Sequence, residues 1–409
     1  MRTTPIAILG AFCWLTVQPR LHAQEACPEG WVLEETLRIG SIDGDDALSN
    51  VLSLTVGPGG AIYVGQTFVP HVAVFSAEGR LVERIGRGGS GPGEFEVAAL
   101  RLGWIGDTLW ARDLNRMQFF APDGSATRQV AFLALDRNEA SHFGPGVPLL
   151  DGTFLGDRGL SGGTAPFFQA ERLSLPRFSA DGEFLDTLAM IPQLPRVEHS
   201  GVAAGHPLGD WTDVSMLPVA ATTDGSAVLL VGEVRGFDRQ PTFDLVKIGA
   251  AGDTLLKRPV AYEPRPVSRS EREWMTDVFG ARAGGEYSQG PRPFWRSDAE
   301  NQRRRRAARE AIWFPDYHPP VRRIVGGSDG SIWLLRELRL PERHDRWELY
   351  DAAGSYQGHV VIEEGMSDFV PWAPRLDVLH ATRDEIWGTT IDSLGVAYIH
   401  RYRTERRCR

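Results

Sequence analysis

Lysine is almost missing from this chain, since only Lys247 and Lys257 occur among its 44 basic residues. We attribute this scarcity to genome composition and assign no function to it. Basic residues are also outnumbered, because 53 acidic residues give a formal net charge of -9. Phosphate backbones repel an acidic protein, so the composition argues against nonspecific nucleic-acid binding.

Long apolar runs are missing as well. The stretch from Ile6 to Val17 has twelve residues, whereas about 20 are needed to span a bilayer. Because a basic residue precedes this stretch and Leu21-His22-Ala23 follows it, residues 1–23 are predicted to be a cleaved secretory signal peptide. The alternatives are a buried N-terminal strand or a membrane anchor. Cleavage would remove two of the 44 basic residues and bring the charge to -11. We expect an extracytoplasmic protein, periplasmic or secreted, without a membrane span.

Glycine, by contrast, is abundant, with 45 residues, and many of them fall in a repeat. A turn followed by a short apolar strand occurs six times, at 60–63, 107–110, 152–155, 225–228, 330–333 and 384–387. An outer turn ending in glycine occurs five times, at 77–79, 122–124, 180–182, 250–252 and 352–354. Short strands separated by such turns are typical of antiparallel hairpins. The pattern predicts an all-β fold, a six-bladed β-propeller with four-stranded antiparallel blades.

The sixth blade lacks a copy of the outer turn and its strand. The segment from Trp31 to Ile39 is similar to the fourth strands of other blades, so we predict that it pairs with the strand around Val396 to Tyr402 and closes the ring. Residues 24–409 then form one propeller domain. Cys27 and Cys408 remain after signal cleavage and flank this seam. In an oxidising compartment we expect a disulfide between them; the alternative is two unrelated exposed thiols.

Blades one and two carry the best-defined motifs. These are Val72-Ala73-Val74-Phe75, Arg84-Ile85-Gly86-Arg87-Gly88, Gly91-Pro92-Gly93-Glu94-Phe95, Asp107-Thr108-Leu109-Trp110 and Asn115-Arg116. This stretch, about 72–132, resembles bacterial six-bladed β-propellers of the NHL-repeat type, which repeat a glycine-rich GPGxF crossing between blades. The resemblance implies the fold and leaves function open, because such propellers include binding platforms, sensor domains, lyases and lactone hydrolases. We expect the glycines to let the backbone cross between blades, with Phe95 packed between them.

The largest departure from the repeat is an insertion at about 262–320, between blades four and five. A capping-box pattern from Ser268 to Glu271 predicts a helix through Phe279, and a second helix is predicted from Ser297 to about Trp313. Its arginines, 303–306 and 309, could bind an anion or form a solvated face balanced by neighbouring acids. Because the insertion interrupts a crossing between blades, we expect it on the long-loop face, as a partial lid over the channel mouth.

Charged residues at the ends of the second strands, together with a histidine ahead of blade five, are predicted to converge at that mouth. The candidate ligand-binding residues are Arg112, Asp113, Arg116, Asp157, Arg158, Glu233, Arg235, His318, Arg336 and Glu337. Their mixed signs could bind a polar ligand or a metal, or the residues could satisfy one another as salt bridges and turn caps. The sequence assigns no catalytic residue.

Two function classes remain open. The first is an exported binding module, a monomer without a cofactor, that presents a surface for a small molecule or a protein at the channel mouth. The second is a metal-dependent lactone hydrolase or lyase, in which a calcium or zinc ion in the channel acts as a Lewis acid. Calcium lactonase-like propellers use Asn and Asp side chains from several blades. This chain has only four asparagines, which favours the binding module.

Overall fold

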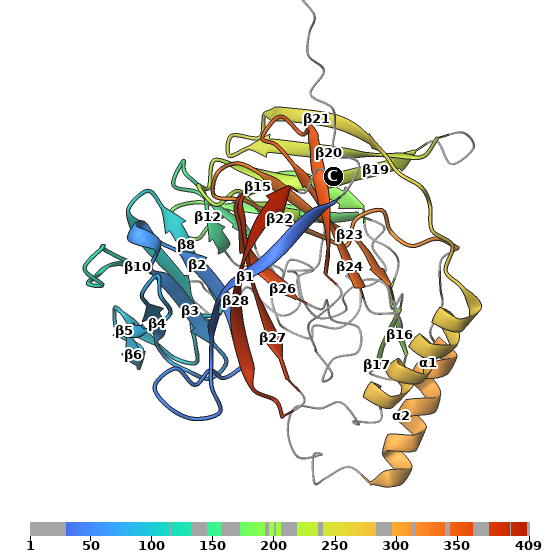
Figure 1. Cartoon of the computed structure of the whole chain (residues 1–409), viewed down its shortest axis with the longest axis horizontal. Helices are drawn as coiled ribbons and strands as arrows, with labels where there is room; N and C mark the ends of the chain where they lie inside the picture. Colours follow the sequence, from blue (N-terminus) through green and yellow to red (C-terminus); the bar gives the residue numbers. More distant parts are fainter. Residues whose placement is uncertain are drawn as a thin grey trace, which may run out of the picture.

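Six four-stranded antiparallel sheets are formed by the described residues, and together they make a six-bladed β-propeller (Figure 1). The structure is a computed structural model. It describes residues 30–113, 116–131, 145–156, 172–192, 196–199, 202–205, 219–235, 240–283, 297–311, 314, 316–339, 344–362, 376–392 and 394–406. The predicted all-β class, the six blades and their four-stranded antiparallel construction are confirmed.

The first three blades follow the chain in order, each starting from its innermost strand. Blade one consists of β2 (Val51–Val56), β3 (Ile62–Gln66), β4 (Val72–Phe75) and β5 (Leu81–Ile85). Blade two consists of β8 (Arg101–Ile105), β9 (Thr108–Arg112), β10 (Arg116–Phe120) and β11 (Ala126–Ala131). Blade three consists of β12 (Pro145–Pro148), β13 (Phe154–Gly156), β14 (Arg172–Phe178) and β15 (Phe184–Pro192).

Blades four and five repeat this order, and blade six combines the two ends of the chain. Blade four consists of β18 (Val219–Ala221), β19 (Ala227–Arg235), β20 (Thr242–Gly249) and β21 (Thr254–Ala261). Blade five consists of β22 (Arg323–Gly326), β23 (Ile332–Arg339), β24 (His344–Tyr350) and β25 (Tyr356–Ile362). Blade six consists of β26 (Asp377–Ala381), β27 (Glu385–Ile391), β28 (Ala397–Arg406) and β1 (Trp31–Ile39). In Figure 1, β1 lies beside β28, with Trp31 opposite Arg406.

The remaining elements lie in the connections. One turn holds the short 3-10 helix η1 (Pro58–Gly60), and the glycine-rich crossing forms a parallel pair of β6 (Arg87–Gly88) and β7 (Glu94–Phe95). A hairpin of β16 (Arg196–His199) and β17 (Val202–Gly205) connects blades three and four. Helices α1 (Arg269–Ala283) and α2 (Asp298–Ala311) connect blades four and five. The two helices pack on each other, and α2 packs on the hairpin (Figure 1).

Asp-Gly-Ser and Asp-Gly-Thr sequences form many of the tight turns. In four of them the aspartate Oδ1 accepts both the backbone N–H and the hydroxyl of the residue two positions on: Asp123 with Ser125, Asp151 with Thr153, Asp224 with Ser226, and Asp329 with Ser331. The glycine between them adopts a positive φ, +82° at Gly330, which side chains disfavour. The repeated residues therefore fix the hairpins by their own local bonding.

The hydrophobic core lies between neighbouring blades. Six clusters of buried residues in the described part of the chain each join two consecutive blades. Phe95 is fully buried between blades one and two, as expected, and stacks on Phe120 with 6.2 Å between ring centroids. One cluster joins blade six to blade one through Ile39, Ile399 and Phe75. Each blade therefore depends on the two beside it.

The helical insertion starts with a capping box. Ser268 Oγ accepts the N–H of Glu271 at 3.2 Å, and Glu271 Oε2 accepts the N–H of Ser268 at 2.9 Å. Two backbone donors at the start of α1 are thereby satisfied. At the start of α2, Ser297 Oγ accepts the N–H of Glu300 at 3.2 Å.

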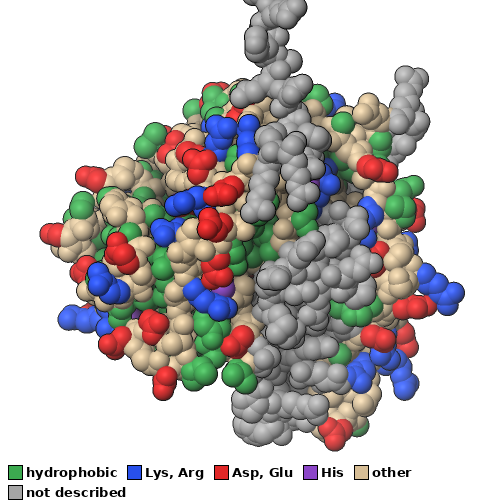
Figure 2. Space-filling model, in the orientation of Figure 1, with side chains coloured by type: hydrophobic (Ala, Val, Ile, Leu, Met, Phe, Trp, Pro, Cys, Tyr) green, Lys and Arg blue, Asp and Glu red, His purple; other side chains and the backbone are tan. Residues whose placement is uncertain are grey.

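Several arginines of α2 form ion pairs with neighbouring acidic residues. Arg303 and Arg304 both pair with Glu300, and Arg309 Nη2 lies 2.7 Å from Oδ1 of Asp277 on α1. Figure 2 shows positive and negative side chains interspersed over the helices, as they are over the blades. These pairs fit the solvated-face interpretation of the arginine run.

Candidate functional site

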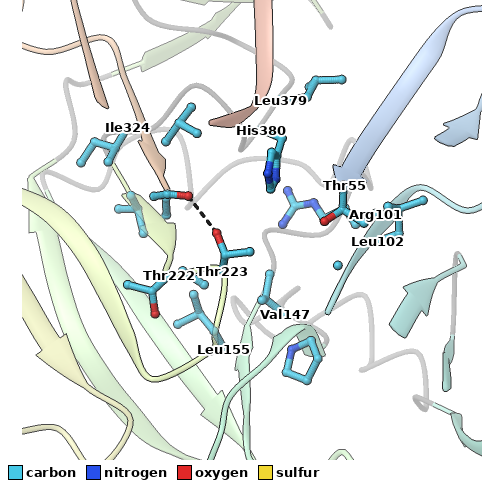
Figure 3. A pocket seen from close by; sticks show the side chains of 18 of the residues that line it. Thr55, Arg101, Leu102, Val147, Leu155, Thr222, Thr223, Ile324, Leu379 and His380 are labelled. Atoms are coloured by element: carbon cyan, nitrogen blue, oxygen red, sulfur yellow. Dashed lines mark hydrogen bonds between the residues drawn. The ribbon is translucent and has the colours of Figure 1, made fainter. Parts of the chain in front are cut away.

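A cavity of about 260 Å³ lies where the innermost strands of the six blades face one another. Each of these strands contributes to its wall. Figure 3 labels Thr55, Arg101, Val147, Ile324 and His380 from five of them, and Ala220 comes from the sixth. The cavity therefore occupies the central channel of the propeller. Its volume is just below the ~300–1,000 Å³ usual for ligand pockets, so it has room only for a small molecule.

The wall of the cavity is mostly apolar, and its charged residues are arginines. Arg101 and Arg323 line it, each the first residue of an innermost strand, while no Asp or Glu is among the described residues of the wall. Arg323 is buried, with 7% of its side chain exposed, and pairs with Asp377. The Asp377 carboxylate is itself outside the wall and 43% exposed.

His380 is a titratable group in the same wall. Figure 3 shows its imidazole projecting from β26 into the cavity, as the side chain of Arg101 does from β8. Burial lowers the pKa of His380 from 6.5 to about 4, and the Asp329 carboxylate offsets only part of this. The ring is therefore neutral at neutral pH, with one nitrogen that donates a hydrogen bond and one that accepts.

Two threonines of the wall already bond to the backbone. Thr222 Oγ1 donates to the carbonyl of Ala227 at 3.1 Å and accepts its N–H at 3.0 Å. Thr223 Oγ1 donates to the carbonyl of Gly326 at 2.9 Å, the dashed line of Figure 3. The hydroxyl of Thr222 therefore stabilises a turn of blade four, and that of Thr223 joins blade four to blade five.

Asp113 and Arg116, two of the predicted site residues, are buried beside the glycine-rich crossing. Asp113 Oδ2 accepts the N–H of Glu96 at 2.5 Å and a hydrogen bond from Arg116 at 3.2 Å. Arg116 also donates to the carbonyl oxygens of Gly89 and Ser90, both at 2.6 Å. This group of bonds holds the crossing against blade two.

Arg336, another predicted residue, lies between blades four and five. Its Nη1 is 2.7 Å from Oε2 of Glu348, and its Nε donates to the carbonyl of Pro320 at 2.5 Å. The guanidinium carbon is 4.8 Å from the ring centroid of Phe243. Arg336 therefore forms an ion pair within blade five and contacts blade four through the aromatic ring of Phe243.

The remaining predicted residues are dispersed. Arg112 is buried in β9, opposite Arg101 in the strand register. Arg235 is half exposed on blade four, with Nη2 2.5 Å from Oδ2 of Asp244. Outside the described part lie Asp157, Arg158 and the side chains of Glu233 and Glu337.

His318 lies at the base of α1. Its Nε2 is 3.2 Å from Oε1 of Glu271, close enough for an ion pair but poorly aligned for a hydrogen bond. Burial raises the pKa of Glu271, but His318, the N–H of Ser268 and Arg265 together hold that pKa well below its usual value. Burial lowers the pKa of His318, and Glu271 offsets part of that effect. The contact attaches the insertion to the chain entering blade five.

None of the predicted site residues that the structure describes is among those lining the cavity. The sequence reasoning missed Arg101, Arg323 and His380, which lie in innermost strands, whereas it considered the ends of second strands. A usable signal exists for the two arginines, because each is the one charged residue of an innermost strand, as Arg101 is in RLGWI.

The described residues were also considered as a possible metal site and as possible membrane-spanning helices. No three His, Cys, Asp or Glu side chains come together there in an arrangement that could hold a metal ion. None of its helices combines the length and the apolar character needed to cross a membrane.

Comparisons with known proteins concern the fold alone. No family model matches this chain, and no curated protein matches it. Similar solved structures include a Bacteroides fragilis protein named as exported, with 12% identity, a TM-score of 0.45, and coverage of 92% of this chain and 96% of that one. The PQQ-bound aldose sugar dehydrogenase from Streptomyces coelicolor has 13% identity and a TM-score of 0.42, covering 93% and 100%. Virginiamycin B lyase from Staphylococcus aureus has 10% identity and a TM-score of 0.38, covering 91% and 99%. Likenesses this distant assign no activity.

Proposed function

We propose that this protein is an exported binding protein that holds a small molecule in its central channel. The cavity carries the proposal, because all six innermost strands contribute to it and its wall combines apolar side chains with a few polar groups. That composition is usual for small-molecule sites. A propeller is a rigid frame for such a site, since every blade is packed between two others.

The ligand would enter from the face that carries the crossings between blades. Arg101 and Arg323 are the first residues of their innermost strands, so they follow directly on crossings. The opposite end of these strands leads into tight turns, such as the one that Asp329 and Ser331 stabilise. Long connections on a rigid scaffold usually carry function.

Helices α1 and α2 would form a partial lid at this mouth. They belong to the crossing between blades four and five, and the hairpin under α2 belongs to the crossing between blades three and four. Two neighbouring crossings therefore supply one connected layer. The contact between His318 and Glu271 would fix the base of that layer to the ring.

The N-terminal strand would close the ring beside a disulfide. Its pairing with β28 and the core cluster that joins blades six and one support closure. Trp31 lies opposite Arg406, near Cys27 and Cys408 in sequence, although both cysteines lie outside the described residues. Residues 1–23 would direct the chain to an oxidising compartment. Mass spectrometry of the unreduced exported protein should find the two cysteine peptides linked, and free thiols at both positions would contradict the proposal.

The binding function can be tested with a variant that fills the channel. Val147 lines the cavity, so Val147→Phe should reduce its volume. Val82→Phe is a matched control, because Val82 is 60% exposed on the outer strand of blade one. Circular dichroism would first establish that both variants fold.

A library of metabolites would then be screened for thermal stabilisation of the wild-type protein. A bound ligand raises the apparent stability by mass action. We expect ligands that stabilise the wild type and Val82→Phe, and that lose this effect on Val147→Phe. Ligands that stabilise all three proteins equally would place binding outside the channel and contradict the proposal.

A further inference from the structure

We propose that the molecule in the channel is a small uncharged alcohol, whose hydroxyl group bonds to His380 and Thr55 and whose apolar body packs on the rest of the wall. This inference rests on the proposed function and specifies its ligand class. The observation that points to it is that these two buried side chains line the cavity without a hydrogen-bond partner in the described part of the chain (Figure 3).

The imidazole of His380 projects into the cavity from β26, and only 6% of this residue is exposed. The Asp329 carboxylate acts on the ring through its charge, but its own oxygens accept hydrogen bonds from the hydroxyl of Ser331 and the N–H of Arg383. Neither ring nitrogen has a hydrogen-bond partner among the described residues. A buried polar group without a partner is unfavourable, so a ligand atom that bonds to the ring is favoured there.

The hydroxyl of Thr55 is the second such group. Thr55 is 3% exposed and belongs to β2, which lies next to β26 in the ring of innermost strands. Its side chain has no hydrogen bond within the described residues, whereas Thr222 and Thr223 on the other side of the channel are bonded to the backbone. A neutral imidazole and a hydroxyl can each donate and accept. A ligand hydroxyl also does both, so it fits either tautomer of His380.

The charges of the wall favour an uncharged ligand. Arg323 pairs with Asp377, and Arg101 has an interaction of its own, so neither arginine is left to receive an anion. No Asp or Glu is among the described residues of the wall to receive a cation, and the His380 ring is neutral at neutral pH. A charged molecule would lose its hydration here without gaining a counter-charge, which costs more than the burial of a neutral hydroxyl.

The volume and the apolar part of the wall describe the body of the ligand. An apolar cavity of ~150 Å³ holds benzene, so by proportion the 260 Å³ of this channel have room for about ten non-hydrogen atoms. Val147, Leu379 and Ile324 come from three different blades, so apolar surface surrounds the channel axis. A secondary alcohol that carries a phenyl ring or a short hydrocarbon chain meets both limits.

The test compares molecules of nearly the same shape that differ in one polar group. One series is 1-phenylethanol, acetophenone, 1-phenylethylamine and benzoate, and the other is 2-octanol, 2-octanone, 2-aminooctane and octanoate. Each would be titrated calorimetrically into the full-length protein at neutral pH, where the amines are cations and the acids are anions. We expect at least one alcohol to bind about tenfold or more tightly than both charged members of its series, and several-fold more tightly than its ketone, which cannot donate.

Variants then locate the hydroxyl group of the ligand. Thr55→Val removes one hydrogen-bonding group with little change of shape, and His380→Phe removes the ring nitrogens; each should weaken binding of the alcohol about tenfold. Thr254→Val and His359→Phe are the matched controls, because both residues lie on outer strands and outside the wall. If His380→Phe does not fold, Thr55→Val and a wild-type crystal structure with the tightest alcohol decide the matter, by whether the ligand oxygen lies within hydrogen-bonding distance of the ring.

The possible results separate this inference from the proposed function. A charged probe that binds as tightly as its alcohol, or an alcohol whose affinity survives both Thr55→Val and His380→Phe, overturns the alcohol assignment. The same criteria apply to the metabolites of the thermal screen. An uncharged hydroxyl-bearing metabolite that needs Thr55 and His380 supports the assignment, whereas channel ligands that are all charged or lack a hydroxyl group overturn it and leave the proposed function standing. If no probe and no metabolite binds in the channel, both fail.

Discussion

Nδ1 of His400 lies 3.0 Å from Oε1 of Glu35, a residue of the N-terminal strand 365 positions earlier in the chain. The other ring nitrogen of His400 is 2.8 Å from Oγ1 of Thr390. One buried ring therefore links β1, β28 and β27. Side chains as well as backbone pairing join the first strand to the last blade, so the ends of the chain should contribute to stability as core elements do.

Replacement of a buried residue in β1 should destabilise the whole propeller. Ile39 is 2% exposed and packs between blades six and one, so Ile39→Ala should lower the free energy of unfolding by about 3 kcal/mol. Ile42→Ala is the matched control, because Ile42 is 72% exposed and should change that energy by about 0.5 kcal/mol or less. Denaturant unfolding of the two variants measures both changes in the free energy of unfolding. Equal, small effects would show that β1 is dispensable.

Loss of the buried arginine at the glycine-rich crossing should be costly. Arg116 has 6% of its side chain exposed, and Arg116→Ala would leave Asp113 buried without this partner, which typically costs about 3 kcal/mol. Arg87→Ala removes an ion pair to Glu94 from an arginine that is 82% exposed, and it should cost about 0.5 kcal/mol. Limited proteolysis should then cut the crossing in the first variant only. Resistance of both variants to cleavage would contradict the role of Arg116 in holding the crossing against blade two.

The buried histidine of the cavity should make stability depend on pH. His380 has a pKa of about 4 in the folded protein and 6.5 when unperturbed, so the unfolded state binds more protons between these values. Stability is therefore full above about pH 6.5 and falls as the pH decreases towards 4. Between pH 7 and pH 5 this group alone should remove about 2 kcal/mol of unfolding free energy.

Replacement of His380 separates its contribution to the pH dependence of stability from that of the other histidines. His380→Gln should flatten the decrease of unfolding free energy between neutral pH and pH 5, while His359→Gln, at a less buried ring, should leave most of it. Urea unfolding at both pH values measures the difference. If the unfolding free energy of His380→Gln decreases with pH as steeply as that of the wild type, the pKa of His380 is not lowered in the folded protein, which would contradict the account.

The base of α1 should open when its buried carboxylate is removed. Glu271→Ala deletes the partner of Arg265 and His318 and half of the capping box, at a local cost of roughly 3 kcal/mol. Glu273→Ala removes only an exposed pair with Arg269, worth about 0.3–0.5 kcal/mol. Hydrogen exchange should become faster across α1 in the first variant and stay unchanged in the blades. Uniform acceleration over the whole ring would instead show that the insertion is part of the core.

The fold could be predicted because its determinants are local. The Asp-Gly-Ser turns that give each hairpin are visible as sequence, and Asp329 bonds to Ser331 two residues away. The capping box at Ser268 is equally local. The hairpin of β16 and β17 was not predicted, although a Ser-Gly pair, a common turn signal, separates its two strands in the sequence.

The site could not be predicted in the same way, since side-chain direction depends on strand register. The pairing of β26 with β27 shifts between Val378 and His380, and such a bulge redirects the side chains that follow. His380 thus lines the channel for a reason that no sequence spacing shows. Arg336 lies within β23 and not at its end as expected, and Arg116 is the first residue of the third strand of blade two. Their contacts with blade four and with the glycine-rich crossing are not visible in the sequence.

The claim that the channel holds a small molecule is tested most directly by a crystal structure of the full-length protein grown with the metabolite that stabilises it most in the thermal screen. The account predicts density for that metabolite in the channel, against Val147 and Leu379. The metabolite bound on the outer surface, with only water between the six innermost strands, would contradict it.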